Sequence, residues 1–142
     1  MDAGPIVFQK EIAIKDTDDA ESLLETCAKL GAKHLIDVTK TYLNNPKKLC
    51  FNQQLESKAS YSNLIKTNDA TLLDSDSPSQ KLAKIKAYYK KPGAFIWQKN
   101  KRIKILKAQL KNNTLQPILI QLEGKQPILY SDYVKGGNSL AL

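Results

Sequence analysis

Residues 94–122 read AFIWQKNKRIKILKAQLKNNTLQPILIQL, and this stretch decides the fold of the C-terminal half of the chain. Residues 94–97 are apolar, and in 103–110 apolar residues alternate in large part with lysine and glutamine, as expected of β-strands with one solvated face. The polar residues 98–102 between them suit a turn. We therefore predict a hairpin with a basic face, followed by another strand over 115–122.

Two elements are predicted near the N-terminus. Residues 6–14 are rich enough in β-branched and apolar side chains to form a strand. Between Leu23 and Leu43, apolar residues recur at helical spacing, which predicts a long helix with one apolar face and a kink near Gly31.

The middle and the end of the chain are more polar. Residues 44–80 contain clusters of Asn, Lys, Ser and Asp with short apolar islets, which is typical of a linker. Residues 80–89 predict a basic helix. A short helix is expected over 131–136, because two glycines follow it.

Charge is divided unevenly along the chain, whose net charge is +8. Residues 79–142 contain twelve lysines and one arginine against two acids, a net charge of +11, whereas residues 1–78 have a net charge of −3. Such asymmetry is expected when one part of a protein meets a polyanion. A lysine-rich surface that is merely solvated is the alternative that composition leaves open.

Several functional classes receive no support from the sequence. The apolar runs are far shorter than the ~20 residues that span a bilayer, and no basic segment precedes an apolar run at the N-terminus, so we expect a cytoplasmic protein without a membrane partner. Cys27 and Cys50 form no C-x-x-C pair and are interpreted as buried or spare thiols, not as metal ligands. The only histidine, His34, lies inside the predicted long helix and is interpreted as a packed or surface side chain.

A series of short motifs follows in a fixed order along nearly all 142 residues. The motifs are DAGPI at 2–6, DT at 16–17, KLG at 29–31, ASY at 59–61, PGAF at 92–95, RIKILKA at 102–108, EGKQP at 123–127, SDY at 131–133 and Gly136. Each motif alone is weak, but their common order is specific, and in this order they resemble the later part of methionyl-tRNA formyltransferase.

This resemblance implies an α+β chain in three parts, beginning within a longer enzyme. Residues 1–44 would be the last strand and the long helix of a Rossmann-like α/β catalytic domain. Residues 45–78 would be the linker, and 79–142 a small OB-like β-barrel that helps to hold tRNA. The family usually has several more strands between the RIKILKA and EGKQP motifs, whereas only 109–122 intervene here, so a reduced barrel is expected.

The family transfers a formyl group from 10-formyltetrahydrofolate to the amino group of methionyl initiator tRNA, using an Asn, a His and an Asp. Only the Asp is matched, by Asp2, which would orient the His while the amine loses a proton and an oxyanion develops. The Asn, the His and the folate pocket would lie upstream of Met1. From the residues alone, Asp2 also fits an exposed acid at a chain terminus.

A basic face is the predicted contribution of this segment to tRNA binding. Lysine charges suit contacts to the phosphate backbone more than reading of bases. Phe95 and Trp97 are candidates for base stacking, but we assign them, like Tyr88, Tyr89 and Tyr133, to the core of the small barrel. The residues predicted to bind tRNA are Lys81, Lys84, Lys90, Lys91, Lys99, Lys101, Arg102, Lys104, Lys107 and Lys111.

Two other functions remain open from the sequence. One is a non-enzymatic RNA-binding module formed by 79–142. The other is a formyltransferase relative that acts on a sugar nucleotide, which the broad cationic face disfavours. The expected partners are initiator tRNA and, if the catalytic half is a separate polypeptide, that polypeptide. The chain itself is expected to be a monomer without a metal.

Overall fold

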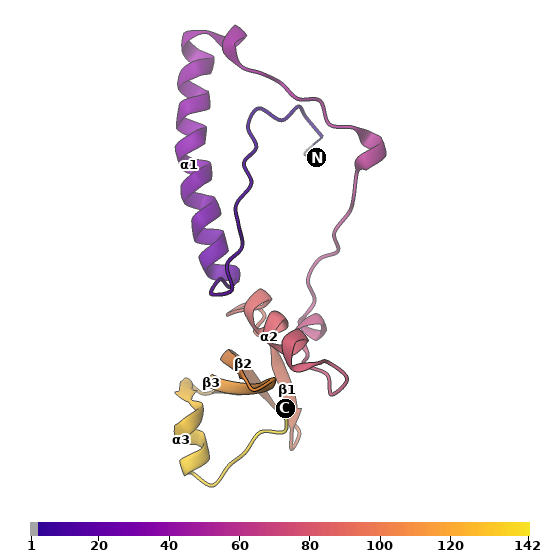
Figure 1. Ribbon diagram of the computed structural model, residues 1–142, viewed down its shortest axis with the longest axis vertical. Helices are drawn as coiled ribbons and strands as arrows, with labels where there is room; N and C mark the ends of the chain where they lie inside the picture. Colours follow the sequence, from indigo (N-terminus) through magenta and orange to yellow (C-terminus); the bar gives the residue numbers. More distant parts are fainter. Residues whose placement is uncertain (1–2) are drawn as a thin grey trace. The chain divides into compact units, whose positions relative to one another are not determined.

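The computed structural model describes residues 3–142, which separate into two compact units. The first unit comprises the residues up to Thr17 together with Ser22–Leu64, and the second comprises Asp18–Glu21 with Ile65–Leu142 (Figure 1). Helices and an antiparallel sheet are both present, so the α+β class predicted from the sequence is confirmed.

A single long helix dominates the first unit. α1 (Ala20–Asn44) covers the predicted apolar stretch and is unbroken at Gly31. Asp19 accepts a hydrogen bond from the Glu21 backbone N–H at 3.0 Å, beside the positive end of the helix dipole. None of the residues of α1 is buried, and Leu24 and Leu43 are 72% and 75% exposed. The apolar face of α1 thus lacks a core within this unit.

The predicted strand over 6–14 is wrong. Among the described residues of this segment only Ile6 pairs, in an isolated antiparallel bridge with Asn52. A strand needs a neighbour for its N–H and C=O groups, and the unit supplies one at a single position. The segment instead runs extended beside α1, where the Phe8 ring stacks on His34 at 3.8 Å. His34 is therefore a packed side chain, as predicted, and Cys27 and Cys50 are both exposed.

Short 3-10 turns interrupt the polar middle of the chain. They lie at η1 (Pro46–Lys48), η2 (Glu56–Lys58) and η3 (Thr67–Ala70). Asn45 caps the first of them, because its side chain accepts a hydrogen bond from the Lys47 N–H.

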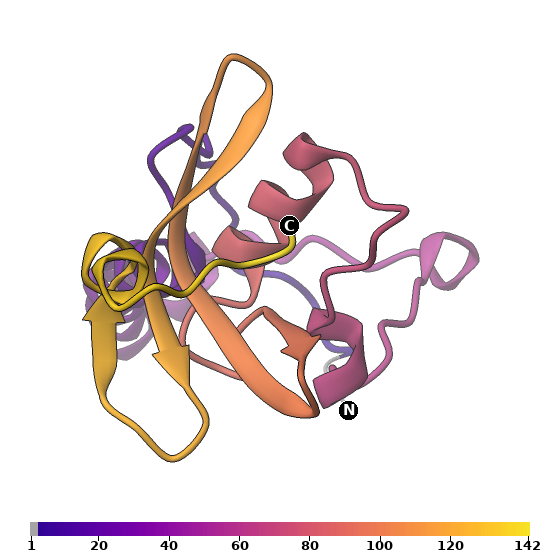
Figure 2. The same cartoon turned by 90° about the horizontal axis from the view of Figure 1, so that it is seen from below.

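The second unit is built on the predicted hairpin, extended to a four-stranded antiparallel sheet in the order β1-β2-β3-β4. Figure 2 shows β2 curving along its length. No strand pairing joins β1 to β4 in the described part of the chain, so the sheet stays open. The strands are β1 (Phe95–Gln98), β2 (Lys101–Lys111), β3 (Thr114–Leu122) and β4 (Pro127–Leu129).

Two-residue turns set the register of the first three strands. Lys99 and Asn100 connect β1 to β2, and Asn112 and Asn113 connect β2 to β3. All four residues have positive φ, between 49° and 60°. Positive φ at both central positions is the signature of type I′ turns, whose twist matches that of the flanking strands.

One face of the sheet packs against α2 (Pro78–Ala87). This helix is capped by a reciprocal pair of hydrogen bonds between Ser77 and Gln80. The third helix, α3 (Tyr130–Lys135), follows β4 directly and contacts β3 and β4. The buried core between these elements consists of Leu72, Ile85, Ala94, Ile96, Ile103, Ile105, Leu115 and Ile120.

The aromatic residues of β1 do not both belong to the core. Phe95 is 2% exposed, as predicted, whereas Trp97 is 63% exposed and its assignment to the core is wrong. Phe95 is covered by the edge of Trp97, at 6.0 Å between ring centroids, and by the guanidinium of Arg102 at 5.5 Å. Trp97 lies near the end of an edge strand, where its outer side remains in solvent.

An ion pair fixes the loop that leads into α2. The Asp76 carboxylate accepts hydrogen bonds from Lys84 Nζ at 2.6 Å and from the Leu73 N–H at 2.9 Å. Lys84 also donates to the Thr71 carbonyl at 3.1 Å. The hydrogen bond from Lys84, followed by that from Leu73, lowers the pKa of Asp76 below its usual value.

We expect Asp76→Asn to lower the free energy of unfolding of the second unit by about 1–2 kcal/mol at pH 7, because the charge-assisted bonds weaken. Because the pKa of Asp76 is lowered in the folded state, its carboxylate stabilises the fold fully above the unfolded pKa of about 4. The difference between the variant and the wild type should therefore shrink as the pH falls below about 4 and disappear only below the lowered pKa. Urea unfolding followed by Trp97 emission measures it. Asp74→Asn, the same charge change at an exposed site, is the control, and equal effects of both variants would contradict the prediction.

Fluorescence quenching can test the placement of Trp97, the only tryptophan. Because the indole is exposed beside Arg102, iodide should be concentrated near it and caesium repelled, so iodide should quench more strongly. The difference should shrink as salt rises. An uncharged indole compound in the same buffers corrects for the intrinsic efficiency of the ions. Blue-shifted emission insensitive to both ions would mean that the ring is buried.

Candidate nucleic-acid interface

The ten basic residues predicted to bind tRNA do not share one environment. Lys81 is only 7% exposed, and Lys84 is half-buried in its pair with Asp76. Both side chains are therefore covered at α2 and are not presented to solvent like the others. Arg102 and Lys104 are half-buried, and the exposed members of the set are Lys90, Lys91, Lys99, Lys101, Lys107 and Lys111.

Six of the ten lie along the β1–β2 hairpin, and we call these six the basic ribbon. At about 3.3 Å per residue, the ten steps from Lys101 to Lys111 span roughly 33 Å. Residues 94–111 contain no acidic side chain. The charges thus form a stripe several Debye lengths long and not one compact patch. The members of the basic ribbon are Lys99, Lys101, Arg102, Lys104, Lys107 and Lys111.

Strand register places two members of the basic ribbon on the face that bears Trp97. Trp97 lies opposite Arg102, and Phe95 lies opposite Lys104. Directly opposed residues share a face of the sheet. A Cβ added to Gly93 would lie 2.9 Å from Lys104 Cδ, so the aliphatic stem of Lys104 packs closely on that backbone. Stems held in this way carry their charge at a defined position.

A second grouping surrounds Tyr89. The pairing of β2 with β3 shifts between Ile105 and Lys107, and Lys107 Nζ lies 5.7 Å from the centroid of the Tyr89 ring. Lys90 Nζ lies at the same distance. Lys90 also forms an ion pair with Glu21, and this hydrogen bond raises the pKa of Lys90. Because an acid already balances Lys90, Lys107 is the stronger candidate for a phosphate contact.

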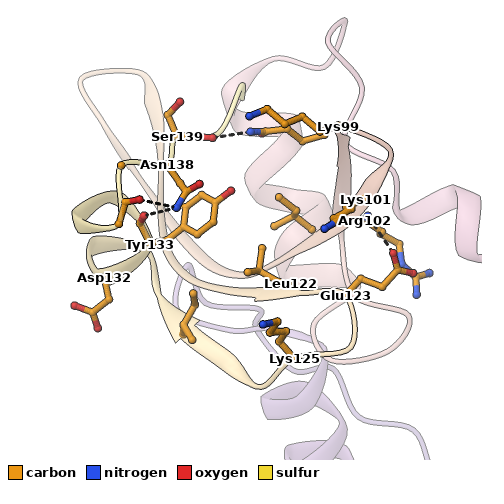
Figure 3. Close-up of a pocket in the computed structure, with 15 residues that line it drawn as sticks. Lys99, Lys101, Arg102, Leu122, Glu123, Lys125, Asp132, Tyr133, Asn138 and Ser139 are labelled. Carbon is orange, nitrogen blue, oxygen red and sulfur yellow. Dashed lines mark hydrogen bonds between the residues drawn. The ribbon is translucent and has the colours of Figure 1, made fainter.

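A cavity of about 640 Å³ lies between the turn that joins β1 to β2 and the C-terminal segment of the chain. Figure 3 shows Lys101 and Lys125 on one side of it, and Tyr133, Asn138 and Ser139 of the C-terminal segment on the other. That segment is tied to β1 by a hydrogen bond of 2.7 Å from Gln98 Nε2 to the Ser139 carbonyl. In the described residues, the buried Gln98 Oε1 has no hydrogen-bond partner.

Lys125 was missing from the predicted tRNA-binding set. It lies in the EGKQP segment between β3 and β4, where Gly124 has φ of +71° and the Lys125 carbonyl accepts a bond from Gln121. Lys125 and Lys101 both line the cavity, an arrangement that the sequence does not show because it depends on the pairing of β2 with β3.

Residues 3–142 offer little support for a catalytic site, a metal site or a membrane-spanning helix. Asp2, the predicted catalytic residue, lies outside the described residues. Within them, no three His, Cys, Asp or Glu side chains are grouped so that they could hold a metal ion. Among the described helices, none combines the length and the apolar character needed to cross a membrane.

Comparison with known proteins gives a consistent result. No family model matches the chain. It is 33% identical over 155 residues to a methionyl-tRNA formyltransferase of Wolbachia pipientis, in a match covering 96% of this chain and 49% of the relative. Proteins with the same name from Pelagibacter ubique and Ehrlichia chaffeensis are 28% and 31% identical, with coverage of 96% and 95% of this chain and 50% of each relative.

The chain spans about half the length of these curated relatives. That share is consistent with the C-terminal portion to which the sequence motifs point. The resemblance read from those motifs is confirmed: this chain is a relative of the methionyl-tRNA formyltransferases, similar to them over nearly its whole length.

Proposed function

We propose that this chain holds the initiator tRNA for formylation, through the phosphates that the basic ribbon contacts. The observation that supports this most directly is the exposed stripe of Lys99, Lys101, Lys107 and Lys111 on a hairpin without acids. Its length of roughly 33 Å is comparable with the rise of about ten nucleotides of one strand along the axis of a duplex. We propose tRNA as the polyanion because the relatives are named methionyl-tRNA formyltransferase.

The reaction in which this chain takes part would be formyl transfer from 10-formyltetrahydrofolate to the amino group of methionyl initiator tRNA. Asp2 would be its only contribution to catalysis, orienting the family's His. That His and the Asn that stabilises the oxyanion have no counterpart among the motifs matched in this chain. A catalytic half that contains them would complete the site, either in the same polypeptide or as a partner.

We also propose correspondences for the two units. The open four-stranded sheet fits a reduced OB-like barrel, because the β2–β3 hairpin replaces the longer connection expected from the family. Residues 3–44 fit the end of a Rossmann-like domain, because the apolar side chains of α1 are exposed and need a sheet to cover them.

Two alternatives remain distinct from this proposal. A non-enzymatic RNA-binding module would use the same basic ribbon and would bind RNA without any part in formyl transfer. A formyltransferase for a sugar nucleotide is less well supported, because a single small ligand does not need charges spread over roughly 33 Å.

We expect the full chain to bind tRNA with an affinity that falls steeply with salt. If about five phosphates are contacted, the slope of log affinity against log salt should be roughly −4 to −5. Lys101→Glu with Arg102→Glu should weaken binding and flatten the slope by about 2. Lys99→Glu with Lys101→Glu reverses two charges at the same end of the basic ribbon but keeps Arg102, so it does not uncover Phe95.

The control for both double variants is Lys47→Glu with Lys48→Glu. These exposed lysines of the first unit give the same change in net charge at a distance along the chain from the basic ribbon. Fluorescence anisotropy of labelled tRNA measures all three. If the control loses as much tRNA affinity as the other two variants, net charge and not the basic ribbon governs binding.

A formylation assay separates holding from catalysis. With 10-formyltetrahydrofolate and methionyl-tRNA, we expect the full chain alone to bind the tRNA without producing formylmethionyl-tRNA, because Asp2 without the His and the Asn supplies no donor that could stabilise the oxyanion. Acid-stable labelled product measures turnover. Product formation by the chain alone would contradict the assignment of the remaining catalytic residues to another part of the enzyme.

A further inference from the structure

We propose that Trp97 is a stacking site for an unpaired nucleobase of RNA, flanked by Arg102 and Lys104, which bind the adjoining phosphates. This site rests on the proposed function and adds a contact to a base, which the basic ribbon alone does not provide. Its starting point is the exposure of Trp97, at 63%, on a strand whose neighbouring residues Phe95 and Ile96 are buried.

The Trp97 ring packs against the buried ring of Phe95. Phe95 is buried at 2% exposure, and its ring meets Trp97 nearly perpendicularly, with an interplanar angle of 89° and 6.0 Å between centroids. This edge-to-face geometry is favourable for aromatic pairs. A side chain already fixed by packing loses little conformational freedom when a ligand binds, so this indole is preorganised for stacking.

Charge on the same face favours a nucleotide over an apolar partner. Arg102 is directly opposite Trp97, and Lys104, whose stem lies against Gly93, is two pairs further along β2. The Arg102 guanidinium lies 5.5 Å from the Phe95 centroid, so cation and rings form one continuous surface. Residues 94–111 contain no acid, and the nearest acid from another strand is Glu123, whose carboxylate accepts a hydrogen bond of 3.5 Å from the Arg102 backbone N–H. Arg102 and Lys104 together outweigh this one carboxylate, so the surface stays cationic and matches a base attached to a phosphodiester backbone.

The base must be unpaired. Bases inside a duplex are already stacked on one another, whereas those of loops and single strands can be placed on aromatic rings. The site should therefore select looped or single-stranded segments without strong preference for sequence, since every base has a π-face. Direct readout by hydrogen bonds is not required.

The first experiment uses the full chain and three ligands of equal charge. These are a single-stranded oligoribonucleotide, the same backbone with abasic sites throughout, and a short duplex. Since Trp97 is the only tryptophan, its emission reports the site directly. We expect strong quenching by the single strand and little by the abasic strand or the duplex. Equal emission changes with the single strand and the abasic strand would overturn the proposal.

The second experiment compares variants by anisotropy of the labelled oligonucleotides. Trp97→Ala should weaken binding of the single strand by about 5- to 150-fold, the range for loss of one stacked base. Trp97→Phe, which keeps an aromatic ring, should retain most of the affinity for the single strand. Neither variant should alter binding of the abasic strand. Leu129→Ala, which truncates an exposed apolar residue on β4, is the matched control and should have no effect.

Salt dependence distinguishes this proposal from the one on which it rests. Loss of stacking should lower affinity at every salt concentration with an unchanged slope, whereas loss of a phosphate contact flattens the slope. If RNA binding depends on salt but Trp97→Ala leaves the affinity unchanged, the stacking site is overturned and the proposal for the basic ribbon stands. Absence of salt-sensitive binding would overturn both. Quenching by an apolar peptide, but not by RNA, would assign the site to a protein partner and overturn it as well.

Discussion

The register between β1 and β2 is the constraint on which the rest of the second unit depends. The two-residue turn at Lys99 and Asn100 places Ile96 opposite Ile103, so both enter the core beneath α2. The same turn places Trp97 opposite Arg102 on the outer face. Because side chains alternate along a strand, a slip of one residue would move the isoleucines into solvent and the charges into the core. Burial of the core therefore also fixes the arrangement of the basic ribbon.

The hairpin, the helices and the α+β class could be predicted because they depend on local periodicity and turn chemistry, which the sequence displays directly. The failures have a common origin in tertiary context. The segment 6–14 has the composition of a strand, but pairing requires a neighbour that the described residues supply only at Asn52. Trp97 has the spacing of a core residue, but it lies near the end of an edge strand and has no element above it. Lys81 has the composition of a surface residue, yet the fold covers it.

The candidate site was predictable in kind and less so in detail. An excess of positive charge without intervening acids indicates a polyanion partner from the sequence alone. Which lysines are available depends on local partners: Asp76 holds Lys84, and Glu21 pairs with Lys90. Lys125 joins Lys101 only through the pairing of β2 with β3. The charge pattern of the sequence thus leads to the hypothesis of a polyanionic ligand, and the three-dimensional contacts show which basic side chains are exposed for it.

In the function proposed for this chain, the elongated stripe of charge and the exposed indole of Trp97 would supply different kinds of recognition. Phosphate contacts add affinity for any nucleic acid, because the backbone charge is the same at every nucleotide. A stacking ring at one point along the stripe responds to whether a base is paired, and so discriminates loops and ends from duplex. Since Phe95 and Arg102 position Trp97 through the same register that orders the basic ribbon, the two contacts lie at a fixed spacing. A tRNA, which presents unpaired bases at defined distances from continuous duplex backbone, is a ligand whose shape such a spacing can select.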